Sequence, residues 1–300
     1  MTKTKVSHAF QVRYLRRSRQ LYRQLVEGKP WIRQLYKSFL GLRPGLRIVD
    51  VGCGTGDFTR YLAELIEGRC RILGVDMRAP SLKAAEAETT KAGFGDRISY
   101  RKGEAYKIPV EDGFSDLTCC RTVLMHLQDP VKAVREMARV TKKGGTVAAV
   151  ERGRMQSFWD PKDQAFAKMS EKMNKCWVDG FRKLDGVDYA IGDELPCIFI
   201  NAGLSKIKAE LSTDAWLNCD SRRKLADIKA ELRFDLHVAE ERKEVDRKAL
   251  LAGGATRRGV DRYFQLYNER ARRLLSDDGK LRRDGSFYAA SWYLVAGQKA

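Results

Sequence analysis

The sequence predicts an α/β protein built on a mostly parallel β-sheet, and three observations lead to this fold class. From about residue 46, short apolar runs alternate with helical patterns. This alternation is typical of strands joined by crossover helices, which leave neighbouring strands parallel. A glycine-rich stretch, "VGCGTG", directly follows the first apolar run, at the position where such folds bind a ligand. The length of 300 residues suffices for one large domain or two small ones.

Seven apolar runs are expected to form the strands. Their ranges are 46–52, 70–76, 98–104, 115–121, 145–151, 204–211 and 286–297. Two helices between them carry start signals, an aspartate followed by proline, at Asp129 and Asp160. Gly144 and Gly145 are expected to close the first of these helices.

Four segments follow from this pattern. Residues 1–44 have a helical pattern and end at the turn "LRPG", so they are expected to form a basic helical arm or lid. Residues 45–211 are the expected α/β core, and 286–300 hold the final strand of its sheet. Between them, residues 212–285 are charged and contain no strand-like run, which predicts a helical insertion rather than a separate domain.

The charge of the chain is strongly basic and unevenly placed. There are 57 Lys and Arg against 39 Asp and Glu, a net charge of +18. Residues 1–47 hold 12 of these bases and a single acid, Glu27, whereas 48–150 are nearly balanced. Such an arm suits an anionic surface, RNA or a membrane, but it equally suits a solvated helical face. No apolar run is long enough for a transmembrane helix, and the N-terminus lacks a secretory signal, which favours a cytoplasmic location. The seven cysteines show no zinc or disulfide spacing, so no metal is expected.

The glycine spacing narrows the choice of ligand. Gly52, Gly54 and Gly56 follow the pattern G-x-G-x-G, with Asp57 where a dinucleotide fold requires its last glycine. No lysine is present to cradle a phosphate. Asp50 and Asp57 beside the turn would repel a pyrophosphate and attract an amine or a sulfonium. The turn is therefore suited to close backbone approach of a ligand other than a phosphate.

At this point the sequence resembles the class I S-adenosylmethionine-dependent methyltransferases. The resemblance covers about residues 45–151, through "VDVGCGTG", "LGVDM", "GEA", "SDLTCCRTVLMHLQDP" and "EMARVTKKGGTVAAVE" in that order. A weaker likeness in 191–204 extends to the ubiquinone/menaquinone-biosynthesis type. The family implies a Rossmann-like sheet, mostly parallel with an antiparallel last strand, N-terminal helices and S-adenosylmethionine as cofactor, with S-adenosylhomocysteine as product.

The resemblance also implies positions for the cofactor. Asp76 would hold the ribose hydroxyls, Met77 would pack on the adenine, and Glu104 with Ala105 would lie near the adenine amine. The backbone carbonyl oxygen of Arg121 would accept a hydrogen bond from the methionyl amino group, or its side chain would bind an acidic substrate. Tyr14 would be a lid residue. The full set of expected cofactor residues is Asp50, Gly52, Cys53, Gly54, Gly56, Asp76, Met77, Glu104, Ala105, Arg121 and Tyr14.

A catalytic base is needed only if the acceptor must lose a proton. His126, just beyond the fourth expected strand, is the candidate, since a histidine takes up a proton near neutral pH; it could also merely pack. Cys119 and Cys120 are rejected as nucleophiles because they lie in an expected buried strand, where cysteine behaves as a small apolar residue. The strand exit "CRTV" also lacks the motif of amine-methylating enzymes.

An apolar stripe is the candidate acceptor pocket. It is expected along a helix after the fifth strand, although such a stripe is more often part of the core, and consists of Phe158, Trp159, Phe166, Met169, Met173 and Trp177. The leading hypothesis is methyl transfer to oxygen or carbon of a small or lipid-like acceptor. The alternatives are a methyltransferase of RNA or protein that uses residues 1–44, and a non-catalytic protein that binds S-adenosylmethionine. The acceptor, the oligomeric state and the purpose of the insertion are left open.

Overall fold

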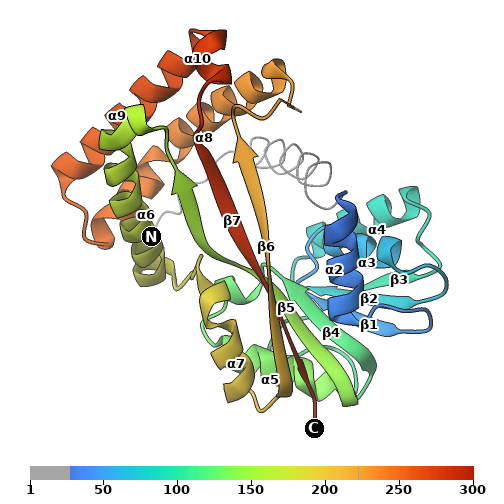
Figure 1. Cartoon of the computed structure of the whole chain (residues 1–300). Coiled ribbons are helices and arrows are strands. Elements are labelled where there is room, and N and C mark those ends of the chain that lie inside the picture. The colour runs from blue at the N-terminus through green and yellow to red at the C-terminus, as the bar shows by residue number, and fades with distance from the viewer. Residues whose placement is uncertain (1–27, 222) are drawn as a thin grey trace. The chain divides into compact units, whose positions relative to one another are not determined.

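The structure, a computed structural model, describes residues 28–221 and 223–300 (Figure 1). The basic arm is described only from residue 28 onward, so Tyr14 and most of the arginine-rich stretch lie outside the described residues. The part of the arm that is described contains helix α2 (Pro30–Leu40), which ends at Gly41 in the left-handed conformation. In the described part of the chain, no helix is long and apolar enough to cross a bilayer.

A seven-stranded sheet organises the chain, in the order β3-β2-β1-β4-β5-β7-β6. The strands are β1 (Arg47–Val51), β2 (Arg71–Asp76), β3 (Ile98–Lys102), β4 (Ser115–Arg121), β5 (Thr141–Phe158), β6 (Ser205–Leu217) and β7 (Phe287–Gln298). β1 pairs in parallel with β2 and β4, and β4 pairs in parallel with β5. The end of β7 instead meets the start of β5, where Gly144 N–H donates to Lys299 O and Lys299 N–H to Gly145 O. β7 therefore runs antiparallel, and the expected fold class is confirmed.

The chain divides into two compact units. In its described part, the α/β unit comprises residues 28–153, 190–212 and 292–300, and the helical unit comprises 154–189, 213–221 and 223–291. The long strands β5, β6 and β7 each contribute residues to both units. The division of the chain into the four predicted segments stays a prediction.

Apolar side chains bury the sheet of the α/β unit on both faces. Ile48, Val49, Val75 and Leu117 are almost completely buried, as expected for a parallel sheet covered by helices. The covering helices are α2, α3 (Asp57–Leu65), α4 (Ala79–Lys91), α5 (Pro130–Val140) and α7 (Leu195–Asn201). α2 packs on α3 through Tyr36, whose ring meets Tyr61 edge-on at 5.5 Å.

β5 differs from its expected extent at both ends. Helix α5 already ends at Val140, so the expectation that Gly144 and Gly145 close it is wrong. The strand begins at Thr141, and the register against β4 shifts between Ser115 and Leu117. Gly144, with a φ of 72°, supplies the backbone conformation for this irregularity rather than a helix cap. At the other end β5 runs on to Phe158, seven residues beyond the expected end.

The helical unit contains α6 (Gln164–Asp185), α8 (Leu225–Ala252), α9 (Arg257–Leu275) and α10 (Asp278–Arg282). The last three lie in the segment predicted as a helical insertion, although its first residues belong to β6, which ends at Leu217. α6 and α8 pack closely at two glycines. A Cβ on Gly180 would lie 1.8 Å from the carbonyl oxygen of Ala249, and one on Gly253 would lie 1.8 Å from that of Cys176.

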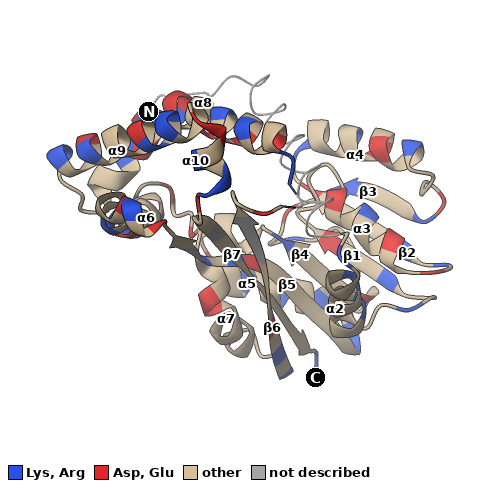
Figure 2. Ribbon diagram, turned by 45° about the horizontal axis from the view of Figure 1, so that its top comes forward, with Lys and Arg blue, Asp and Glu red and all other residues tan. Residues whose placement is uncertain are grey.

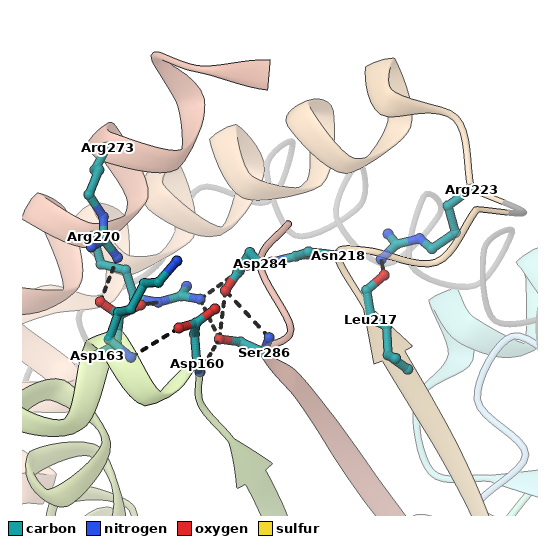
Figure 3. A network of polar contacts seen from close by, with 10 residues as sticks. Asp160, Asp163, Leu217, Asn218, Arg223, Arg270, Arg273, Asp284 and Ser286 are labelled. Atoms are coloured by element: carbon teal, nitrogen blue, oxygen red, sulfur yellow. Dashed lines mark hydrogen bonds and ion pairs between the residues drawn. The ribbon is translucent and has the colours of Figure 1, made fainter. Parts of the chain in front are cut away.

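A buried polar network surrounds Arg270 of α9 (Figure 3). Its guanidinium donates to Asp163 Oδ2 at 2.9 Å, and to Asp284 Oδ2 and Ser286 Oγ at 2.7 and 2.8 Å. Ser286 Oγ also accepts from the backbone N–H of Asp160. The arginine and both aspartates are less than a tenth exposed. The network thus joins the segment before α6, helix α9 and the segment that enters β7.

Candidate functional site

The glycine turn between β1 and α3 needs glycine at each of its three glycine positions. Gly52, Gly54 and Gly56 have φ values of 68°, 54° and 76°, a region that other residues rarely adopt. A Cβ on Gly52 or Gly56 would also collide with Val123 or Tyr100. At Gly54 a Cβ would meet no atom within 4 Å, so this side of the turn is open to a ligand.

Three segments meet at this turn. The backbone N–H of Gly54 donates to Asp76 Oδ2 at 2.9 Å, and Cys53 N–H donates to the carbonyl oxygen of Val75. Asp76 ends β2, and its own carbonyl oxygen accepts from Gly103 N–H after β3. The structure therefore brings the first glycine motif, the acidic end of β2 and the start of the "GEA" segment together.

A cavity of about 1040 Å³ opens beside these segments in the α/β unit. Three of its lining residues, Met77, Gly103 and Glu104, lie in the segments expected to surround the adenine. Met77 is 64% exposed, which leaves its thioether available to a planar ligand. Four further lining residues were not expected from the sequence, namely Tyr106, Ile108, Pro109 and Val110. The apolar "IPV" after "GEA" was the signal for them, since three apolar residues stand there between charged ones.

Asp50 lies beneath the turn and is only 1% exposed. Its Oδ2 accepts from the Thr59 hydroxyl at 2.6 Å. Burial raises the pKa of Asp50 to about 7, against the opposing effects of the Thr59 hydrogen bond and the Arg121 charge. Cys53 is also buried, which raises the pKa of its thiol. These two expected cofactor residues thus support the turn from its protein side.

The remaining candidate residues, Arg121 and His126, lie at and just beyond the end of β4. The guanidinium of Arg121 lies 4.7 Å from the ring centroid of Phe58 in α3, a cation–π arrangement. His126 ends a short 3-10 helix, η2 (Leu124–His126), with its side chain exposed. Partial desolvation of the imidazole, followed by the nearby Arg78 charge, lowers the pKa of His126. A neutral imidazole at physiological pH is the form that accepts a proton.

Cys119 and Cys120 are fully buried in β4. Burial raises the pKa of each thiol well above its ordinary value, so the nucleophilic thiolate is disfavoured. This agrees with their rejection as nucleophiles from the sequence.

The expected helix with the apolar stripe needs a correction. Phe158 is the last residue of β5, and Trp159 lies between that strand and α6, so neither is on the helix. Phe158 stacks on Phe287 of β7 at 4.5 Å. Phe158 and Trp159 help to line a second cavity, of about 510 Å³, within the helical unit.

The other four residues of the stripe do lie on α6. Met173 is part of a buried cluster with Leu250 and Val260 from α8 and α9, and Met169 and Trp177 pack against that cluster. Phe166 is also buried and stacks on Tyr263 of α9. The side chains that look like a pocket lining in the sequence are packed against α8 and α9 in the core of the helical unit.

Comparisons with known proteins agree with this geometry. A family model described as a methyltransferase domain matches residues 49–149. The demethylmenaquinone methyltransferase of Lactiplantibacillus plantarum is 34% identical over 110 residues, 37% of this chain and 46% of that protein. The demethylmenaquinone methyltransferase of Desulfitobacterium hafniense is 28% identical over 177 residues, 55% of this chain and 68% of that protein. The solved structure of the YcgJ protein from Bacillus subtilis matches with a TM-score of 0.51 at 17% identity, covering 89% of this chain and 98% of that one.

The likeness to the YcgJ structure shows only the fold. The family match and the glycine turn indicate the class of protein. Residues 49–149 match the family described as a methyltransferase domain, so this part of the chain is similar to methyltransferases. Within that class, the chain is similar to the methyltransferases of menaquinone and ubiquinone biosynthesis. The chain spans about half the length of most of the curated relatives that it matches.

Proposed function

We propose that the protein transfers a methyl group from S-adenosylmethionine to oxygen or carbon of a small or lipid-like acceptor. The observation that carries the enzyme class is the glycine turn, open at Gly54 and tied to Asp76 by a hydrogen bond of 2.9 Å. The names of the relatives, demethylmenaquinone methyltransferases, favour a lipid-like ring acceptor. The absence of an amine-methylation motif at the exit of β4 also favours oxygen or carbon.

The residues present fit this cofactor. Asp76 offers a carboxylate for the ribose hydroxyls, and Met77 offers an exposed apolar side chain for the adenine. Gly52 to Gly56 offer backbone that a ligand can approach closely. The sulfonium supplies an already activated methyl group, so the protein has mainly to align the acceptor and exclude water. His126 would take a proton from an acceptor that must lose one.

Helix α8 of the described chain is not a uniformly basic element. Helix α8 interleaves seven acidic with six basic residues, and Figure 2 shows the two signs mixed along it. The concentrated basic excess lies in residues 1–47, most of which precede the described part of the chain. A macromolecular acceptor therefore has no uniform basic face on α8 to bind.

The test is a transfer assay with donor labelled in the methyl group. The protein is incubated with cell extract that has been separated into lipid, small polar, RNA and protein fractions. We expect label in the lipid or small-molecule fraction, and a drop of about 10²-fold for His126→Gln if the histidine acts as general base. Binding of S-adenosylhomocysteine, measured by calorimetry, is expected to be unchanged in that variant.

Two results would contradict the proposal. Label in RNA or protein would replace it with the macromolecular alternative. Binding of S-adenosylmethionine without label in any fraction would favour the non-catalytic alternative.

A further inference from the structure

The turn that leaves β4 contains an unusual backbone conformation. Thr122 has a φ of 55°, in the left-handed region. For a β-branched residue this conformation is a genuine outlier and costs on the order of 1–3 kcal/mol. Such a cost persists only where the surrounding structure holds the residue firmly.

Two consecutive residues of β5 hold this turn. The carbonyl oxygen of Val150 accepts from the backbone N–H of Thr122 at 3.0 Å. The carboxylate of Glu151 then accepts from the N–H groups of Val123 and Leu124, at 2.7 and 2.8 Å through Oε1. One carboxylate oxygen therefore satisfies the donors of two successive residues.

Glu151 is itself in a costly position. It is completely buried, and its second oxygen, Oε2, has no hydrogen-bond partner in the described part of the chain. A buried carboxylate with an unsatisfied oxygen lowers stability. A strained turn and a buried acid at one place indicate that the arrangement serves function rather than stability.

The turn touches the glycine turn directly. A Cβ on Gly52 would lie 2.5 Å from Val123 Cγ2, so the Val123 side chain packs against the backbone of Gly52. The same turn continues into η2, which ends at His126. Movement of Val123 would therefore shift the candidate base relative to the glycine turn.

We propose that Glu151 is a positioning residue for methyl transfer, whose carboxylate fixes the turn of residues 122–126 against the glycine turn and thereby sets the place of His126. This inference rests on the proposed function, because it gives the turn a part in that reaction. It assigns Glu151 no contact with the cofactor or the acceptor. Its effect runs through the backbone donors that it binds.

The first experiment needs no acceptor. Hydrogen exchange at the Val123 and Leu124 amides is measured by NMR in the full chain for two variants. Glu151→Leu fills the buried space without an acceptor atom, and Glu151→Gln keeps one acceptor oxygen. We expect at least tenfold faster exchange in the Leu variant and less than threefold in the Gln variant. Unchanged protection of both amides in the Leu variant would overturn the proposal, whether or not the protein proves to be a methyltransferase.

The second experiment separates positioning from general stability. Asp116→Leu is the matched control, since Asp116 Oδ2 accepts the backbone N–H of Arg47 at 2.8 Å near the other end of β4. With the lipid extract as acceptor, we expect Glu151→Leu to lower kcat by about 10²-fold. The KM for S-adenosylmethionine and the Kd of S-adenosylhomocysteine should stay within threefold.

Equal losses of kcat in the control and in Glu151→Leu would contradict a positioning role. If the wild-type protein labels no fraction, the proposed function fails, and the exchange measurement still decides whether Glu151 fixes the turn.

Discussion

Asp76 joins the glycine turn to the end of β2 with one carboxylate. Its Oδ2 accepts from Gly54 N–H and its Oδ1 from Arg78 N–H, at 2.9 and 2.8 Å. An asparagine keeps one acceptor oxygen but loses the charge and half of the acceptor capacity that two ribose hydroxyls would use.

Asp76→Asn is therefore expected to weaken S-adenosylmethionine binding by at least tenfold, about 1.4 kcal/mol or more. Isothermal calorimetry with Asp96→Asn as control measures this, because Asp96 is exposed and the change in charge is the same. Equal affinities of the two variants would remove Asp76 from the binding site.

Buried acids also give this protein a pH-dependent stability. The pKa of Asp50 is raised by burial to about 7, whereas its ordinary value is 3.8. The folded state thus holds a proton that the unfolded chain releases at lower pH, so the contribution of Asp50 to stability is fully present below about pH 4 and is lost as pH rises through 7. Burial raises the pKa of Glu151 to about 7 as well, which adds to the fall.

Asp50→Asn is expected to flatten the decline of Tm between about pH 4 and pH 7, because asparagine cannot ionise while its oxygen can still accept from Thr59. Thermal unfolding followed by circular dichroism at several pH values checks this. Asp96→Asn again serves as control and should leave the decline as it is. A decline of unchanged slope in Asp50→Asn would show that the aspartate is ionised throughout.

At the scale of elements, helices α6 and α8 meet without room for a side chain at two glycines. Gly180→Ala would bring a Cβ to 1.8 Å from the backbone of Ala249, which no rotamer change can relieve. We expect a loss of about 1–3 kcal/mol or more in the free energy of unfolding, as for an overpacked core. Urea unfolding compares it with Gly285→Ala, where a Cβ would meet no atom within 4 Å. Equal stability of the two variants would mean that the helices are less tightly packed.

Elements far apart in sequence are also joined by Arg270. Arg270→Met leaves Asp284 buried without its cation and Asp163 paired only with the more exposed Arg273, so we expect a loss of about 3–5 kcal/mol. Arg247→Met removes the more exposed pair with Asp261 and should cost about 1 kcal/mol or less. Chemical denaturation distinguishes the two, and similar losses would show that the network adds no more than a surface ion pair.

At the scale of the whole molecule, the salt dependence of methyl transfer tests whether the net charge of +18 serves to bind an anionic acceptor. Methyl transfer to a neutral lipid-like acceptor should change less than about twofold between 50 and 200 mM salt, whereas a chain that contacts 6–10 phosphates would lose about 10³–10⁵ in affinity. The labelled-donor assay at several salt concentrations makes this comparison. A steep loss with salt would favour RNA.

The sequence by itself determined the parts that depend on local pattern. Strand order along the chain, the glycine turn and the acid that ends β2 are all set within a few residues, so "IVDVGCGTG" and "LGVD" could be read directly. The parallel core followed from alternating strands and helices, because a crossover helix leaves the next strand parallel.

The tertiary structure alone decided what depends on partners distant in sequence. The stripe Phe166, Met169, Met173 and Trp177 is compatible with a pocket as well as with a core, and only the packing of α8 and α9 against it decides for the core. The bonds from Val123 to Glu151 cross 28 residues, and no local pattern marks either partner. Periodicity shows which face of an element is apolar, but only folding in three dimensions determines what lies against that face.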